Sequence, residues 1–362
     1  MRLSVIIFYL FIPAAASAQV IVRGSAVQPA AAIEAAAPQA VAPDSAQWQT
    51  AYLNMNSGYD DFCPAVFNRG LLFVSNRGRT RVAQYRDSKD QSPFFTIYYV
   101  YDVAMLKGTP DPQWKTAAPV QPKAIPASSN DTRKVAATKP AAPLPENVVI
   151  LKGDQHISLF NQQVNGRFND GPVSFNQRQD TMYITRNGRS GNKKSPDRLQ
   201  IHTFIYRYGD WLPAGIFPFN SNEYSTGHPA VHPNGHLLYF VSDRPGGVGG
   251  TDIYYTQKID SGWSEPQNAG QVVNTPGNEM FPYFAPDGTL YFSSDGRGGE
   301  GGLDLFFVQL SGNTPTGEAR NLGAPVNSPQ DDFGIWLNAD GRSGYFSSNR
   351  YGTDDVFEMK RK

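Results

Sequence analysis

The chain has 362 residues, 40% of them hydrophobic, and its 32 basic residues balance its 32 acidic residues. This balance gives no electrostatic case for nucleic-acid binding, which requires a clustered basic face. A single cysteine, Cys63, excludes an internal disulfide framework, so packing must stabilise the fold. Cys63 lies in an apolar pattern, and we interpret it as a small buried side chain.

The first predicted element is a secretory signal peptide over residues 1–18. Arg2 precedes an apolar run, and the small residues Ala16-Ser17-Ala18 are typical of a cleavage site. The run is too short for a transmembrane helix, and no later run has spanning length. We therefore predict an exported protein without a transmembrane segment, either periplasmic or secreted to the cell surface. Residues 19–47 are rich in Ala and Pro, which indicates a spacer.

Five short apolar stretches each end in a hydroxyl side chain that a polar turn follows. The hydroxyl residues are Ser75, Thr185, Ser242, Ser294 and Ser348, and the last four follow one another at intervals of 52 to 57 residues. A repeat of this length is one supersecondary unit, which buries its apolar face only by stacking on its neighbours.

The best-preserved copy begins at Asn278. It predicts strands over 281–285 and 290–293 around a Pro-Asp-Gly turn, and a third strand over 304–308 after a Gly-rich loop. A fourth strand is expected between copies, in a segment that ends in an apolar residue and Asn. These asparagines are Asn56, Asn165, Asn220, Asn274 and Asn327. Four strands in a repeat of about 50 residues are typical of a propeller blade.

The sequence thus predicts an all-β fold, a β-propeller of five blades over residues 48–362. The last copy ends after its third strand, and an unassigned strand precedes the first copy. We therefore expect the N-terminal strand to complete the C-terminal blade and close the ring. The long interval from Asn56 to Asn165 leaves six blades as the alternative. Much of it is a Pro-, Ala- and Lys-rich stretch at about 109–146, predicted to be a disordered insertion that serves as an interaction arm or a passive loop.

Charged residues recur in the loop between the second and third strands. One set is interpreted as structural, because carboxylates that recur from blade to blade are suited to accept hydrogen bonds from loop amides. Calcium binding is the less favoured alternative. The residues of this set are Asp243, Asp252, Asp295, Asp304 and Asp355. The other set would form a ring on one face, where it is the candidate site for an acidic partner or glycan carboxylates: Arg77, Arg244, Arg297 and Arg350. Local pairing of these arginines with nearby Asp and Asn residues is the favoured interpretation.

Neither a metal site nor a cofactor is predicted. His228, His232 and His236 recur every four residues, but on a strand and turn this spacing does not converge as it does on a helix. No nucleophile, phosphate-binding or dinucleotide motif is present. A glycosidase needs two facing carboxylates, and the sequence cannot place any pair of the acids that break the repeat, namely Asp60, Asp154, Asp210 and Glu300.

The stretches over residues 228–255 and 281–307 resemble the WD-like propeller repeat of the TolB type. The resemblance is closest to exported proteins of Bacteroidetes, where this repeat accompanies OmpA-like peptidoglycan-binding domains and occurs in a periplasmic component of type IX secretion. It covers roughly residues 48–362 apart from the insertion. It implies a propeller that serves as a binding scaffold at the bacterial envelope, while peptidoglycan binding, which resides in the OmpA-like domain, does not carry over.

We therefore predict a non-enzymatic scaffold that binds protein partners or other components of the cell envelope, glycan and peptidoglycan included. The alternative is a carbohydrate-binding or glycoside-processing propeller. The two differ in the central funnel, because an enzyme requires two or three convergent acids with perturbed pKa values there.

Overall fold

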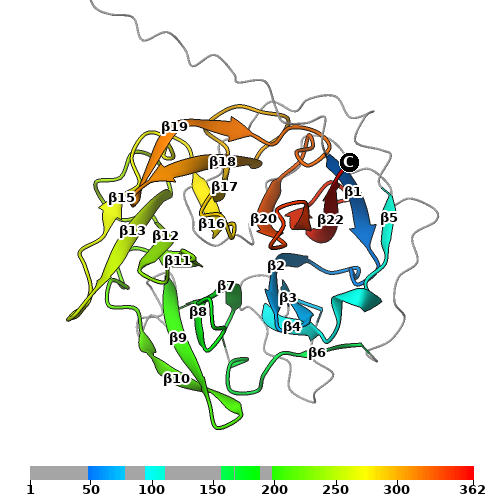
Figure 1. The fold of residues 1–362 in the computed structure, drawn as a ribbon, viewed down its shortest axis with the longest axis horizontal. Coiled ribbons are helices and arrows are strands. Elements are labelled where there is room, and N and C mark those ends of the chain that lie inside the picture. The colour runs from blue at the N-terminus through cyan, green and yellow to red at the C-terminus, as the bar shows by residue number, and fades with distance from the viewer. Residues whose placement is uncertain (1–47, 78–93, 111–155, 167, 188–197) are drawn as a thin grey trace, which may run out of the picture. The chain divides into compact units, whose positions relative to one another are not determined.

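The computed structural model describes residues 48–77, 94–110, 156–166, 168–187 and 198–362. These residues form five antiparallel sheets that surround a common centre as a five-bladed β-propeller (Figure 1). The predicted all-β propeller is thus confirmed, with five blades as expected. The predicted signal peptide and spacer lie outside the described residues, as does the predicted insertion from residue 111 onward.

Each blade starts at the centre and proceeds outward. Blade 1 contains β2 (Asp61–Phe67), β3 (Gly70–Ser75), β4 (Thr96–Val100) and β6 (Ile157–Leu159). Blade 2 contains β7 (Asp170–Phe175), β8 (Thr181–Asn187), β9 (Leu199–Arg207) and β10 (Asp210–Ile216). Blade 3 contains β11 (Thr226–Val231), β12 (Leu237–Ser242), β13 (Asp252–Ile259) and the short β14 (Gly262–Trp263) and β15 (Gln267–Asn268). Blade 4 contains β16 (Glu279–Phe284), β17 (Leu290–Ser294), β18 (Asp304–Ser311) and β19 (Thr314–Asn321). Blade 5 contains β20 (Asp332–Leu337), β21 (Ser343–Ser348), β22 (Asp355–Arg361), β1 (Trp48–Leu53) and β5 (Gly108–Pro110).

Blade 5 closes the ring as predicted. Strand β1 pairs antiparallel with β22, so that Trp48 lies opposite Arg361 and the blue and red ends of the ribbon run side by side (Figure 1). The sequence did not predict β5, which adds a fifth strand outside β1. Thr109 and Pro110, at the start of the predicted insertion, belong to this strand. The only other element of the described residues is the 3-10 helix η2 (Val103–Met105).

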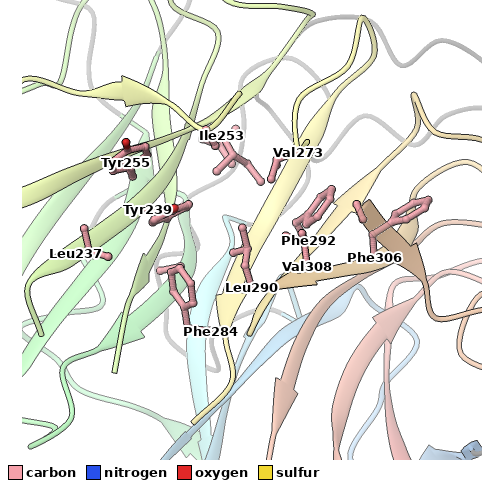
Figure 2. Packing of buried hydrophobic residues seen from close by; sticks show 14 residues of the cluster. Leu237, Tyr239, Ile253, Tyr255, Val273, Phe284, Leu290, Phe292, Phe306 and Val308 are labelled. Atoms are coloured by element: carbon pink, nitrogen blue, oxygen red, sulfur yellow. The ribbon is translucent and has the colours of Figure 1, made fainter. Parts of the chain in front are cut away.

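The hydrophobic core lies between adjacent blades. Figure 2 shows the cluster that joins blades 3 and 4, in which the ring of Tyr239 meets the edge of Phe284 with centroids 4.9 Å apart. Leu290 and Phe292 from β17 are fully buried in the same cluster. Because every blade buries its faces on its neighbours, the five sheets form one cooperative unit rather than separable parts.

The repeated asparagines lie in a different place from the one predicted. They do not end the fourth strands but follow them, as Asn327 follows β19 after five intervening residues. Each side-chain amide accepts a hydrogen bond from a backbone N–H of the third strand and donates one to the carbonyl of the same residue, at 2.8 to 3.1 Å; the pairs are Asn56 with Val356, Asn165 with Ile97, Asn220 with Ile201, Asn274 with Ile253, and Asn327 with Leu305. The amide therefore imitates one residue of a neighbouring strand, which is why the motif looked like a strand end.

Candidate functional site: the central funnel

The five inner strands β2, β7, β11, β16 and β20 surround a cavity of about 580 Å³, which we call the central funnel. Its lining comprises residues 63–66, 172–177, 179, 228–233, 281–284, 286 and 334–339. The first part of each stretch belongs to the middle of an inner strand, and the last part of four of them belongs to the turn that follows. The funnel therefore extends from buried strand residues to exposed turns such as those at Gln177 and Ala339.

A β-bulge shapes the buried end of the funnel. All five inner strands shift register at the equivalent position, and there Cys63, His228, Phe281 and Gly334 have φ values between 47° and 58°. For the three residues other than Gly334, this left-handed conformation costs free energy, so neighbouring groups must hold it. The backbone N–H of Cys63 donates to Ser347 Oγ of the adjoining blade at 2.8 Å.

Stacked rings fill the buried end. The imidazole of His228 lies parallel to the ring of Phe281 with centroids 4.3 Å apart, and its Nδ1 accepts a hydrogen bond from the Phe281 backbone N–H. Phe281 in turn contacts Phe333 at 4.8 Å. This places His228 in an aromatic stack rather than in a metal site, and no cluster of three potential metal ligands occurs in the described part of the chain.

Half-buried aromatic residues and carboxamides form the wall and mouth of the funnel. The aromatic ones are Phe175, Tyr283 and Trp336. Burial raises the pKa of Tyr283, whose hydroxyl donates to the carbonyl of Leu337 at 3.0 Å. Gln177 is exposed at the mouth, where its side chain makes no hydrogen bond within the described residues. A surface of this kind is suited to bind an apolar ligand group that has a few polar groups at its edge.

Charged side chains are missing from the funnel as far as the structure describes it: its lining contains no Asp, Glu, Lys or Arg. Burial lowers the pKa of His232, which lines the mouth, and so favours its neutral imidazole. Of the acids that break the repeat, Asp210 accepts a hydrogen bond from Asn161, which follows β6, and Asp60 accepts one from Asn76; neither acid lines the funnel. Glu300 lies in the loop before β18, and Asp154 is outside the described residues. The described lining therefore offers no pair of facing carboxylates.

The opposite ends of the blades hold the arginines that were predicted to contact a partner. Arg77 donates from Nη2 to Asp61 at 2.6 Å and to the carbonyl of Met55 at 3.0 Å. Arg350 does the same with Asp332 and with the carbonyl of Val326, both at 2.7 Å. The carbonyl in each case precedes a repeated asparagine, so these guanidinium groups fasten the start of an inner strand to the preceding connection. Binding of a partner by them stays a prediction.

The remaining arginines are less uniform. Arg297 donates to the carbonyl of Val273 at 2.7 Å, and it lies near Glu279, whose pKa burial raises to about 7. Arg186, which sequence reasoning missed, makes the equivalent ion pair with Asp170 at 2.7 Å in blade 2. It escaped notice because it directly follows Thr185, whereas its counterparts stand two or three residues after the aligned hydroxyl. Among the described residues, Arg244 makes no ion pair with an acid.

The repeated aspartates accept hydrogen bonds within or between loops. Asp243 accepts from the backbone N–H of Ser225, Asp295 from that of Asn278, and Asp304 from that of Glu300. Asp252 accepts from the backbone of Gly249 and from the Asn268 side chain, and Asp355 from the hydroxyls of Tyr52 and Thr353. Burial, with the nearby charge of Asp332, raises the pKa of Asp304 to about 8. A structural role for these five residues remains our interpretation.

Sequence reasoning did not identify the funnel residues. The signal was present in the inner strands, where the residues at the bulge position differ from blade to blade while the flanking pattern is retained: Cys63, His228, Phe281 and Gly334. A position that varies inside a well-preserved repeat is one that the fold does not require to be the same. Such positions are candidates for a ligand contact.

No family model and no curated protein matches the chain. Among solved structures it is similar to a protein of unknown function from Dyadobacter fermentans, with 12% identity over 87% of this chain and 98% of that one and a TM-score of 0.45. It is also similar to a putative TolB from Agrobacterium tumefaciens (13%, 83% and 77%, TM-score 0.41) and to an endo-arabinase from Bacteroides thetaiotaomicron (11%, 86% and 96%, TM-score 0.45). Likenesses at this level carry no argument about activity.

The described part of the chain contains no helix with the length and apolar character needed to span a bilayer.

Proposed function

We propose that this protein is a non-enzymatic binding scaffold whose central funnel receives an uncharged, largely apolar element of a partner protein. The observation that carries the proposal is the described lining of the funnel, which is contributed by all five inner strands and contains no charged side chain. An apolar group that enters this cavity loses contact with water without leaving a buried charge unpaired. The mouth amides and the aromatic wall would then orient it.

The partner is expected at the bacterial cell envelope. The signal-peptide pattern over residues 1–18 supports export, and the resemblance of the repeats to those of exported Bacteroidetes proteins supports a periplasmic or cell-surface location. On the same ground we propose a role in envelope assembly, with type IX secretion as the specific process that the resemblance suggests.

Site-specific photo-cross-linking tests the role of the funnel. A photoreactive phenylalanine analogue replaces Gln177 at the mouth in one variant and Thr316, exposed on the outer strand β19, in the control. After irradiation in a cell-envelope extract of the source organism, the Gln177 variant is expected to give a discrete cross-linked protein that the Thr316 variant does not give. Addition of Ala339→Arg, which places a long cation at the mouth, should remove that product. Equal products from both positions would show that the funnel is not the binding site.

A neutral glycan is the second candidate ligand. Trp336 and Tyr283 offer aromatic faces beside the carboxamides of Gln177 and Asn338, a combination that also suits a sugar ring with its hydroxyl groups. A glycan array distinguishes the two. Retention of a neutral oligosaccharide that Trp336→Ala abolishes, together with no cross-linked protein from Gln177, would replace the protein partner by a carbohydrate.

A further inference from the structure

The equivalent arginine of every blade except blade 3 is compensated by an acid or lies near one. In blades 1, 2 and 5 the acid is the first residue of the inner strand, at 2.6 to 2.7 Å from the guanidinium: Asp61, Asp170 and Asp332. In blade 4 the same position holds Glu279. In blade 3 it holds Thr226, which is fully buried. The repeat thus keeps the arginine of blade 3, Arg244, but lacks the carboxylate that accompanies it elsewhere.

The second acid of the repeat is missing at the same junction. Blades 3, 4 and 5 each begin their third strand with an aspartate, namely Asp252, Asp304 and Asp355. Blade 2 begins its third strand with Leu199, which packs beside Gly227 of blade 3. The junction between blades 2 and 3 therefore carries neither of the acids that line, for example, the junction between blades 4 and 5.

Arg244 has donor capacity that no described group uses. Its Nε donates weakly to Ser242 Oγ at 3.4 Å, but neither Nη1 nor Nη2 donates a hydrogen bond to any described residue. In the other blades, the carbonyl that precedes the repeated asparagine accepts a hydrogen bond from the guanidinium. The equivalent carbonyl in blade 3, that of Phe219, accepts instead from the hydroxyl of Thr226. An arginine that is held in place with idle N–H groups is unusual, because a buried donor without an acceptor costs free energy.

Aromatic rings hold this guanidinium. It lies 5.1 Å from the ring centroid of Tyr224, 5.4 Å from that of Phe240 and 4.9 Å from that of Tyr254. Stacking on rings uses the faces of a planar guanidinium and leaves its N–H groups, which lie in the plane, directed to the edge. The cage therefore positions the cation without neutralising it.

A second arginine increases the local positive charge. Arg198 makes one long ion pair with Asp243, at 3.5 Å, and its Nε has no hydrogen-bond partner among the described groups. Asp243 is already engaged by the backbone N–H of Ser225 at 2.6 Å. Among the described side chains, Asp243 therefore pairs with Arg198 alone, and no carboxylate pairs with Arg244.

We propose that the junction of blades 2 and 3 binds the carboxylate of a ligand, with Arg244 as the main contact and Arg198 as the second. A carboxylate is the expected group because in three other blades the equivalent guanidinium is satisfied by one, and because its two oxygens match two parallel N–H groups. Arg244 is only partly buried, so Nη1 offers the approach. This site lies at the ends of the blades opposite the mouth of the funnel, and it does not depend on the function proposed for the funnel.

Thermal unfolding of the full chain in acetate tests the proposal. Sodium acetate replaces sodium chloride at constant ionic strength, because a ligand that binds only the folded state raises Tm. A concentration ten times Kd is expected to raise the Tm of the wild type by about 2 to 4 °C. Thr226→Asp supplies the missing carboxylate from within, so it should raise Tm in chloride and remove the acetate increment. Thr226→Val, of similar size and without charge, should retain the increment.

The side-chain Nε–H resonance of Arg244 gives a direct readout. It is assigned as the signal lost in Arg244→Lys, and it should shift on addition of acetate to the wild type and to Thr226→Val, but not to Thr226→Asp. An acetate increment of the same size in the wild type and in Thr226→Asp would overturn the proposal, because the increment would then be a general salt effect. An Arg244 resonance that acetate leaves unchanged would overturn it as well.

Discussion

The two ends of the blades differ in how faithfully they repeat. At the end that carries the loop arginines, the same residue types perform the same task in blade after blade, as Asn274 and Asn327 show with their paired hydrogen bonds to the third strand. At the funnel, equivalent positions hold a thiol, an imidazole, a phenyl ring and a glycine. Structural demands are identical in every blade, whereas a ligand on the axis, such as the one proposed above, would meet each blade differently.

This difference separates residues that stabilise the ring from residues free to specify a ligand. Arg244 lacks the acid that its counterparts have, so it departs from the pattern at the end of the blades that otherwise repeats. Such a departure indicates a residue that could contact a ligand, as the variable positions of the funnel do. Variants that change one end at a time should therefore differ in how much stability they lose.

Loss of a buried ion pair at the repeated end should have the largest effect. Arg350→Met leaves the carboxylate of Asp332 buried without its cation and removes hydrogen bonds to two backbone carbonyls. Breaking such a pair from one side lowers the free energy of unfolding by about 3 to 5 kcal/mol. Urea unfolding measures it, with Arg342→Met, on an exposed turn, as a control expected to change by less than about 0.5 kcal/mol. Similar losses for the two variants would contradict the structural role.

Loss of a repeated asparagine should rank second. Asn327→Ala deprives the N–H of Leu305 of its acceptor and removes one of the two hydrogen bonds to its carbonyl, which keeps the one from the N–H of Leu322. One unsatisfied buried N–H together with the loss of a second hydrogen bond is expected to lower the free energy of unfolding by about 2 to 4 kcal/mol. The matched control is Asn222→Ala on the surface, for which little change is expected in the same urea titration. A blade that tolerated Asn327→Ala as well as Asn222→Ala would show that the imitation of a strand residue is dispensable.

Alkaline pH should destabilise the fold through its buried acids. The pKa of Asp304 is raised to about 8 by burial and by Asp332, so the folded state holds this proton more tightly than the unfolded state does. Its stabilising contribution is complete below the unfolded pKa and is lost as pH rises through about 8. We expect the free energy of unfolding to fall between pH 7 and pH 9, well above the pKa of His202, which burial lowers to about 4.

The same experiment on Asp304→Asn isolates the effect. This variant cannot ionise, so its stability should change less between pH 7 and pH 9 than that of the wild type. A wild-type stability that rises over this window, or an equal slope for the two proteins, would refute the assignment.

Changes at the funnel mouth should have the smallest effect on stability. Ala339→Arg adds a side chain at an exposed turn and should alter the free energy of unfolding by less than about 0.5 kcal/mol. Its effect should appear only in the cross-linking of the partner, as a loss of the product at Gln177. If Ala339→Arg lowered both the free energy of unfolding and the yield of cross-linked product, the funnel mouth would contribute to stability as well as to binding, contrary to this prediction.

Most of the fold could be predicted from the sequence because the same strand and turn pattern occurs in several copies. The aligned hydroxyls mark the ends of β3, β12, β17 and β21, and Thr185 lies two residues before the end of β8. Strand β5 could not be predicted, since a three-residue strand has no periodicity of its own and its partner β1 lies more than fifty positions earlier. The asparagines were misplaced because a side-chain amide that pairs like a backbone looks like a strand end in sequence.

The candidate site was harder to predict for a geometric reason. Phe175, Tyr283 and Trp336 come from blades far apart in the sequence and meet only around the common centre. No local sequence pattern indicates that these three side chains lie close together. The loop arginines showed the opposite situation: their pairing with nearby acids was the favoured interpretation, but only the three-dimensional comparison of blades identifies Arg244 as the one without an acid among those described.

The closure of blade 5 has a consequence for how the chain reaches its native state. The side chain of Asn56 is bonded to Val356, 300 positions later, and the hydroxyl of Tyr52 to Asp355. Contacts of such sequence separation carry a large loop-closure entropy and form late. During synthesis β1 therefore lacks its partner β22, though not β5, until the end of the chain has emerged, and the ring closes in a late step.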